Sequence, residues 1–144
     1  MKIINKMPYN YLILPQTVKM IKKNIFSVFV AMTILYLSLA SSDTFKNVPF
    51  STIPNLDKLV HISMYFGLMS AIIFDNRKSI NSTKQVLLIA LIPLFYGILM
   101  EFLQGFLTVS RSASIYDVLA NSTGIIISIL VWLWVKPTIQ NSVR

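Results

Sequence analysis

The sequence is short of charged residues and has no cysteine. It contains five acidic residues and one histidine, and charged residues make up 12% of its 144 positions. An average soluble domain carries about 25% charged residues. The missing cysteines exclude a disulfide scaffold and a cysteine-ligated metal site. The scarcity of charge, combined with 55% hydrophobic residues, excludes a disordered chain, a collagen and a coiled coil.

Long apolar stretches make up most of the sequence. A helix needs about 20 mostly apolar residues to cross a bilayer. Stretches close to this length occur at 25–42, 57–74, 85–108 and 115–135. We therefore predict an all-α integral membrane four-helix bundle. A soluble four-helix bundle is the alternative, but it would have little polar surface left to face water.

The predicted domain organisation follows from these stretches. Residues 1–24 form a basic arm, residues 25–135 form the four-span transmembrane domain, and residues 136–144 form a short tail. Both ends of the chain then lie on the same side of the membrane as the loop between the second and third spans.

The net charge of +8 has two interpretations, nucleic-acid binding or membrane topology. The side with both termini holds ten basic residues and one acid, Asp75, whereas the other side holds three basic and four acidic residues. Because positive charge concentrates on the cytoplasmic side of membrane proteins, we predict that both termini are cytoplasmic and that no nucleic acid is bound.

Ionisable residues within spans are costly, so they are candidates for function. Asp57, His61 and Tyr65 follow one another at four-residue intervals and therefore share one face of the second span. Two structural alternatives stay open, because Asp57 can act as the N-cap of that helix and His61 can be an ordinary hydrogen-bonded packing residue.

The third span carries Glu101 and Gln104 on the same face as Gly97. Glu101 lies about 10 Å below the outer end of the span at 1.5 Å per residue. A carboxylate at that depth should pair with a partner or be protonated. The glycine allows a neighbouring helix to approach closely, and a purely structural hydrogen bond from Glu101 is the alternative.

The loop and the fourth span add further polar groups at the outer level. Asp117, Asn121, Gly124 and Ser128 form one stripe of the fourth helix. The last two are small residues spaced for helix packing. Arg111 precedes this stripe and can form a surface ion pair with Asp117, which would contribute little to stability. Three spans and one loop thus send polar groups to one level, and we predict a site there.

The spaced motifs resemble those of the VanZ-like membrane proteins. They are Asp57-Lys58-x-x-His61-x-x-x-Tyr65, Glu101-x-x-Gln104, and Arg111 followed by Asp117-x-x-x-Asn121-x-x-Gly124. The resemblance covers about residues 25–135. It departs from the family pattern before Arg111, where Val109 and Ser110 replace a frequent proline, and after Gly124, where Ser128 replaces a frequent glycine.

The resemblance implies a small bacterial protein of the inner (cytoplasmic) membrane. The family takes its name from a member linked to low-level resistance to the glycopeptide teicoplanin, and its biochemical activity is not established. The resemblance nominates a functional set of nine residues, namely Asp57, Lys58, His61, Tyr65, Glu101, Gln104, Arg111, Asp117 and Asn121.

Two functions fit this set. In the first, the outer-face site binds an envelope ligand, either a lipid-linked cell-wall intermediate or a glycopeptide, among membrane lipids. In the second, the protein is an enzyme in which His61, Glu101 and Asp57 perform acid–base chemistry, while Lys58 and Arg111 hold a phosphate or carboxylate. A transporter is disfavoured, because the inner halves of the second and fourth spans are nearly all apolar.

No cofactor and no metal are predicted for either function. A zinc site of one His and carboxylates is the alternative, which is poorly supported because zinc sites usually draw on more His or Cys ligands. The sequence does not indicate an oligomeric state.

Overall fold

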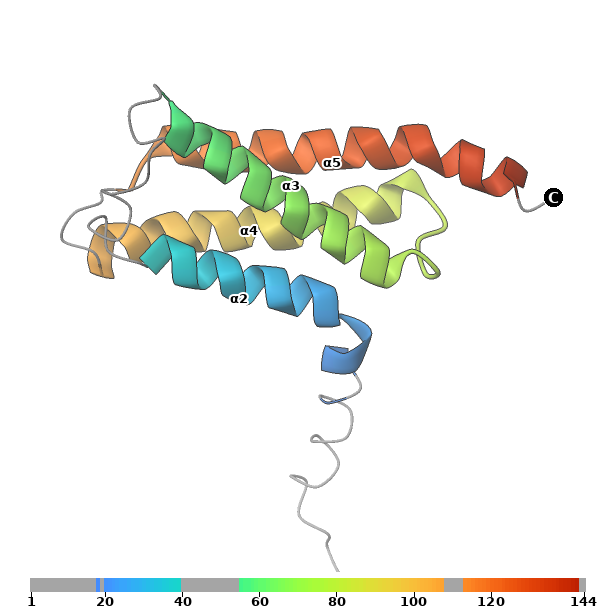
Figure 1. Cartoon of the computed structure of the whole chain (residues 1–144), viewed down its shortest axis with the longest axis horizontal. Coiled ribbons are helices and arrows are strands. Elements are labelled where there is room, and N and C mark those ends of the chain that lie inside the picture. Colours follow the sequence, from blue (N-terminus) through green and yellow to red (C-terminus); the bar gives the residue numbers. More distant parts are fainter. Residues whose placement is uncertain (1–17, 19, 40–54, 108–112, 143–144) are drawn as a thin grey trace, which may run out of the picture.

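The structure is a computed structural model that describes residues 18, 20–39, 55–107 and 113–142. Its principal helices are α2 (Ile25–Leu39), α3 (Leu56–Asn76), α4 (Thr83–Leu107) and α5 (Ile115–Ser142). No strand occurs in these ranges. Figure 1 shows the helices running side by side, with α3 crossing diagonally past its neighbours. The predicted all-α fold is confirmed.

Three helices are long and apolar enough to cross a membrane: α3, α4 and residues Ile115–Val135 of α5. Their bounds agree with the predicted spans to within two residues, because the hydropathy pattern and the helix coincide there. α5 continues beyond the predicted end at residue 135, since helical hydrogen bonds also form in polar sequence. α2 has 15 residues, and the rest of its predicted span, 40–42, lies outside the described residues.

The outer surface of the described helices is unusually apolar. Large side chains such as Phe29, Leu88, Phe95 and Trp134 are all more than 60% exposed. A soluble monomer rarely exposes such extended apolar surface, whereas lipid accepts it without cost. The exposed surface therefore agrees with the long apolar helices in indicating a membrane protein.

The helix α3 is central to the packing and has its most extensive contact with α5. Its buried side chains Tyr65, Leu68, Met69, Ile72 and Ile73 form much of the core. Between the two helices, the Ser70 and Ser128 hydroxyls lie 2.9 Å apart and share a hydrogen bond. This contact fits the small-residue packing predicted for Ser128.

At the opposite end of the molecule from the start of α3, a side chain of α3 caps α2. Asp75 Oδ2 accepts hydrogen bonds from the Ser27 backbone N–H at 2.9 Å and from the Ser27 hydroxyl at 2.6 Å. Asn76 Nδ2 donates to Asn24 Oδ1 at 3.0 Å. The first N–H groups of a helix have no partner within the helix, so a carboxylate there satisfies one and complements the helix dipole. These bonds hold α2 in register with α3.

Candidate functional site

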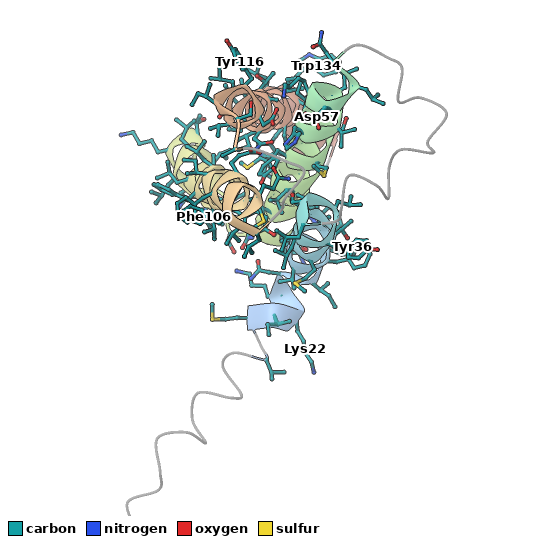
Figure 2. The ribbon with its side chains drawn as sticks, turned by 90° about the vertical axis from the view of Figure 1, so that its left-hand side faces the viewer. Lys22, Tyr36, Asp57, Phe106, Tyr116 and Trp134 are labelled. Carbon is teal, nitrogen blue, oxygen red and sulfur yellow. The ribbon has the colours of Figure 1, made fainter. Side chains whose placement is uncertain are left out.

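One end of the helix assembly collects the polar residues that the sequence places at the outer level. α3 and α5 begin there and α2 and α4 end there (Figure 1). We define the polar cluster as Asp57, Lys58, His61, Tyr65, Glu101, Asp117 and Asn121. All but Asp57 and Lys58 are at most 6% exposed. Figure 2 looks at this end and shows Tyr36, Phe106 and Tyr116 directed outward from α2, α4 and α5.

His61 is held from both sides of its ring. Its Nδ1 lies 3.0 Å from Asn121 Oδ1 and 3.7 Å from Glu101 Oε1, whereas its Nε2 lies 3.8 Å from Asp57 Oδ1. In the neutral ring, an Nδ1–H that donates to the Asn121 oxygen leaves the lone pair on Nε2. The contacts therefore orient the imidazole with Nδ1 toward Asn121 and Glu101 and with Nε2 toward Asp57, which is more than half exposed.

Lys58 joins the starts of α3 and α5. Its ammonium bonds to Asp117 Oδ1 and, at 3.2 Å, to Asp57 Oδ2. The Asp117 side chain is only 9% exposed, whereas the Lys58 side chain is 33% exposed. The ion pair considered for Asp117 in the sequence involved Arg111, which lies outside the described residues. In the structure, Lys58 is the cation that pairs with Asp117.

The first residues of α3 and α5 show which residue caps α3 and how Glu101 contacts the start of α5. Asn55, with φ 61°, occupies the N-cap position of α3, so Asp57 lies within the first turn and is not the N-cap. At α5, the Ser114 N–H donates to Glu101 Oε2 at 3.4 Å. Ser114 and Asp117 have the spacing of a capping box. This spacing is visible in the sequence and could have identified Ser114 as a residue at the start of α5.

The glycines of α4 and α5 bring the helices close enough to form the cluster. A Cβ at Gly97 would lie 3.1 Å from the Tyr65 ring and 3.2 Å from Asn121 Nδ2. At Gly124 it would collide with the α3 backbone, at Ile62 O and Phe66 N. Both glycines therefore serve the close approach that the sequence predicts for them.

Gln104 is buried and connects α4 to α2. Its Nε2 donates to the Ser38 backbone carbonyl at 2.9 Å. A hydrogen bond between two helices is a structural role, and ligand binding by Gln104 stays a prediction.

Several buried polar atoms of the cluster have no hydrogen-bond partner among the described residues. They are Tyr65 Oη, Glu101 Oε1 and Asn121 Nδ2. Leaving a buried donor or acceptor unpaired costs about 1–3 kcal/mol, and native structures contain few such atoms. Three of them in one cluster indicate a place where a bound molecule, ion or water completes the hydrogen bonding.

The cluster also brings together side chains that ligate metals. One oxygen of Asp57, one of Asp117 and a ring nitrogen of His61 lie within 4.8 Å of one another. The sequence predicted no metal, because zinc sites usually draw on more His or Cys ligands, and it did not show that Asp57 and Asp117, 60 residues apart, lie close together.

These features define a class: a helical membrane protein with a polar cluster at one end of its apolar helices. A family model described as VanZ/LLP1 matches residues 3–136, and the chain belongs to this family. The match confirms the resemblance drawn from the spaced motifs. No curated protein matches the chain, and neither does any solved structure.

Proposed function

We propose that the chain is a four-span protein of the bacterial cytoplasmic membrane, with both termini in the cytoplasm and the polar cluster facing outward. The support is the uneven charge, since ten basic residues and a single acid fall on the proposed inner side. Exposed aromatic side chains near the two ends of the helices suit the two interfaces of a bilayer. Tyr36, Phe106 and Tyr116 lie near one end and Trp134 near the other.

This topology is open to a direct labelling test, because the native chain has no cysteine. We expect a membrane-impermeant thiol reagent, applied to intact cells, to label Thr52→Cys and to leave Ser79→Cys unlabelled until the membrane is permeabilised. If Ser79→Cys alone is labelled in intact cells, the protein has the opposite orientation in the membrane.

We infer that the polar cluster binds an envelope ligand, a lipid-linked cell-wall intermediate or the glycopeptide itself, and thereby changes susceptibility to teicoplanin. The observation that carries this inference is a set of buried polar atoms, on Tyr65, Glu101 and Asn121, that have no hydrogen-bond partner in the part of the chain that the structure describes. Asp57 and Lys58 are partly exposed beside them and offer a route from the surface. The teicoplanin link comes from membership of the VanZ/LLP1 family.

An enzyme acting on a lipid-linked or phosphate-bearing substrate at the outer leaflet is the second candidate. The observation in its favour is the His61 ring, which Asn121 orients and which lies between the Asp57 and Glu101 carboxylates. A positioned imidazole next to a carboxylate is a common acid–base pair. Chemical turnover of a lipid-linked substrate by the purified chain, lost in His61→Gln, would favour this candidate over simple binding.

Expression of the chain in a susceptible host tests the binding function. We expect the wild type to raise the inhibitory concentration of teicoplanin and Asp117→Asn to return it to the level of the empty host. The reason is that the Asp117 carboxylate holds the Lys58 ammonium and so joins the starts of α3 and α5 beside the buried His61.

The matched control is Asp75→Asn, the same change at the opposite end of the molecule, where the amide oxygen can still accept from Ser27. We expect it to retain the wild-type susceptibility, with both variants present in the membrane at equal amounts. An equal loss in the two variants, or none in either, would contradict a function located at the polar cluster.

A further inference from the structure

We propose that Asp57, His61 and Asp117 bind a divalent transition-metal ion, and that the Lys58 ammonium takes the place of this ion when the metal is absent. This inference deepens the proposed function, on which its biological meaning rests, by naming the ion that completes the same cluster. It departs from the sequence, in which no metal was predicted.

The ligand set is chemically suitable. It consists of one imidazole nitrogen and two carboxylate oxygens within 4.8 Å of one another. Imidazole suits zinc, copper, iron and nickel, and carboxylates also accept manganese, so the mixed set favours Zn²⁺ or Mn²⁺. Ligands of a tetrahedral zinc at about 2.1 Å are about 3.4 Å apart. The three groups must therefore draw together by little more than an ångström, and the exposed Asp57 side chain has room to do so.

The surroundings of His61 match those of a metal-bound histidine. Such a histidine almost always donates its second ring N–H to an oxygen acceptor, which fixes the ring and makes the first nitrogen a better ligand. Asn121 Oδ1 provides that acceptor at 3.0 Å from Nδ1. The other ring nitrogen, Nε2, faces Asp57 at 3.8 Å and is the one left for an ion.

Glu101 supplies an independent indication that the cluster suits a cation. It is 96% buried, and its Oε1 has no hydrogen-bond partner among the described residues while lying 3.7 Å from His61 Nδ1. A buried carboxylate requires compensating positive charge. A dication on the far side of the ring would make the Nδ1–H a stronger donor toward Glu101 and Asn121.

The charge balance of the cluster also favours a bound cation. Its described members include three carboxylates, Asp57, Glu101 and Asp117, against the single ammonium of Lys58. That ammonium already lies between two of the carboxylates. A cation is thus already located where the ligand oxygens converge, and a divalent ion would satisfy more of the negative charge than a lysine does.

Exchange of the lysine for an ion is sterically feasible. Lys58 has a flexible stem, and its side chain is 33% exposed, so it can turn toward solvent. Asp57 lies beside it and its side chain is 55% exposed, so the ligand set includes a group at the surface. Once bound through three protein ligands, the ion keeps an open position. That position can accept a phosphate oxygen of a lipid-linked ligand, which the metal-free, negatively charged cluster would repel.

Direct metal titration of the full chain tests the proposal. The chain is purified in detergent, stripped with a chelator and titrated with Zn²⁺ against a chelating indicator, and Co²⁺ absorption reports the ligand geometry. We expect one ion per chain. Asp117→Asn and His61→Gln should each weaken binding by at least about tenfold, and Asn121→Leu by about tenfold through loss of the orienting bond.

Substitution of Lys58 distinguishes a metal site from an ordinary ion pair. Lys58→Met removes the competing cation, so we expect Zn²⁺ to bind about tenfold more tightly, whereas Asp75→Asn at the opposite end leaves binding unchanged. If a variant fails to fold, the wild type still provides a test, because Zn²⁺ should raise its unfolding temperature. Equal binding by the wild type, His61→Gln and Asp117→Asn, or weaker binding by Lys58→Met, would overturn the proposal.

Failure of this inference and failure of the proposed function are separable, because the titration needs no antibiotic. A chain that binds one Zn²⁺ through these residues but leaves teicoplanin susceptibility unchanged supports the metal site and contradicts the function. A chain that changes susceptibility without binding Zn²⁺ or Mn²⁺ supports the function and contradicts the metal site.

Discussion

Replacing Gly124 by alanine is expected to lower the free energy of unfolding by about 3 kcal/mol, the upper end of the range for inserting one carbon into a packed core. A Cβ at this position meets the Ile62 carbonyl and the Phe66 nitrogen, the latter at 2.8 Å. Both atoms belong to the backbone of α3, which cannot turn aside as a flexible side chain can. The helices α3 and α5 must therefore separate along their contact, the most extensive in the structure.

The matched control is Gly67→Ala in α3, because nothing lies within 4 Å of a Cβ built there. Alanine is the better helix former by about 1 kcal/mol, so this variant should be as stable as the wild type or slightly more stable. Thermal unfolding in detergent, followed by size-exclusion chromatography, measures both. We expect the midpoint to fall by about 10 °C for Gly124→Ala alone, and similar midpoints for the two variants would contradict the packing described for α5.

The sequence predicts the helices of this protein well because their bounds depend on local chemistry. The spans predicted at 57–74, 85–108 and 115–135 correspond to helices at Leu56–Asn76, Thr83–Leu107 and Ile115–Val135. The length of an apolar stretch and the width of a bilayer are enough to locate such segments. Helical periodicity likewise places His61 and Tyr65 on one face, and both are buried there.

Contacts between helices were harder to predict, because they depend on the rotation and depth of each helix. The sequence did not predict that Lys58, 59 residues earlier, pairs with Asp117, and the pair that it offered, Arg111 with Asp117, lies outside the described residues. It counted Asp75 only as an inner-side charge, whereas Asp75 caps α2 through Ser27. Periodicity identifies the face on which a side chain lies but not the partner that this face meets.

Replacing Glu101 by glutamine is expected to abolish the effect on teicoplanin susceptibility while leaving the protein as stable as the wild type or more stable. The buried Oε1 has no hydrogen-bond partner among the described residues, so the carboxylate has a desolvation cost that its contacts offset only in part. Glutamine keeps the size of the side chain and an oxygen that can accept from the Ser114 N–H. It removes the carboxylate beside His61, on which we propose that ligand and metal binding depend.

The control for this prediction is Tyr96→Phe on the same helix, which should lower the stability of the protein and leave susceptibility unchanged. The Tyr96 hydroxyl donates to the Ala31 carbonyl of α2 at 2.6 Å, so its loss should cost about 1 kcal/mol of stability. Tyr96 is not part of the polar cluster, so susceptibility should stay at the wild-type level. Inhibitory concentrations and unfolding temperatures measured on both variants check the two outcomes together. If Glu101→Gln instead unfolds at a lower temperature and keeps the wild-type effect on susceptibility, this prediction is contradicted. Glu101 would then only stabilise the packing of the helices.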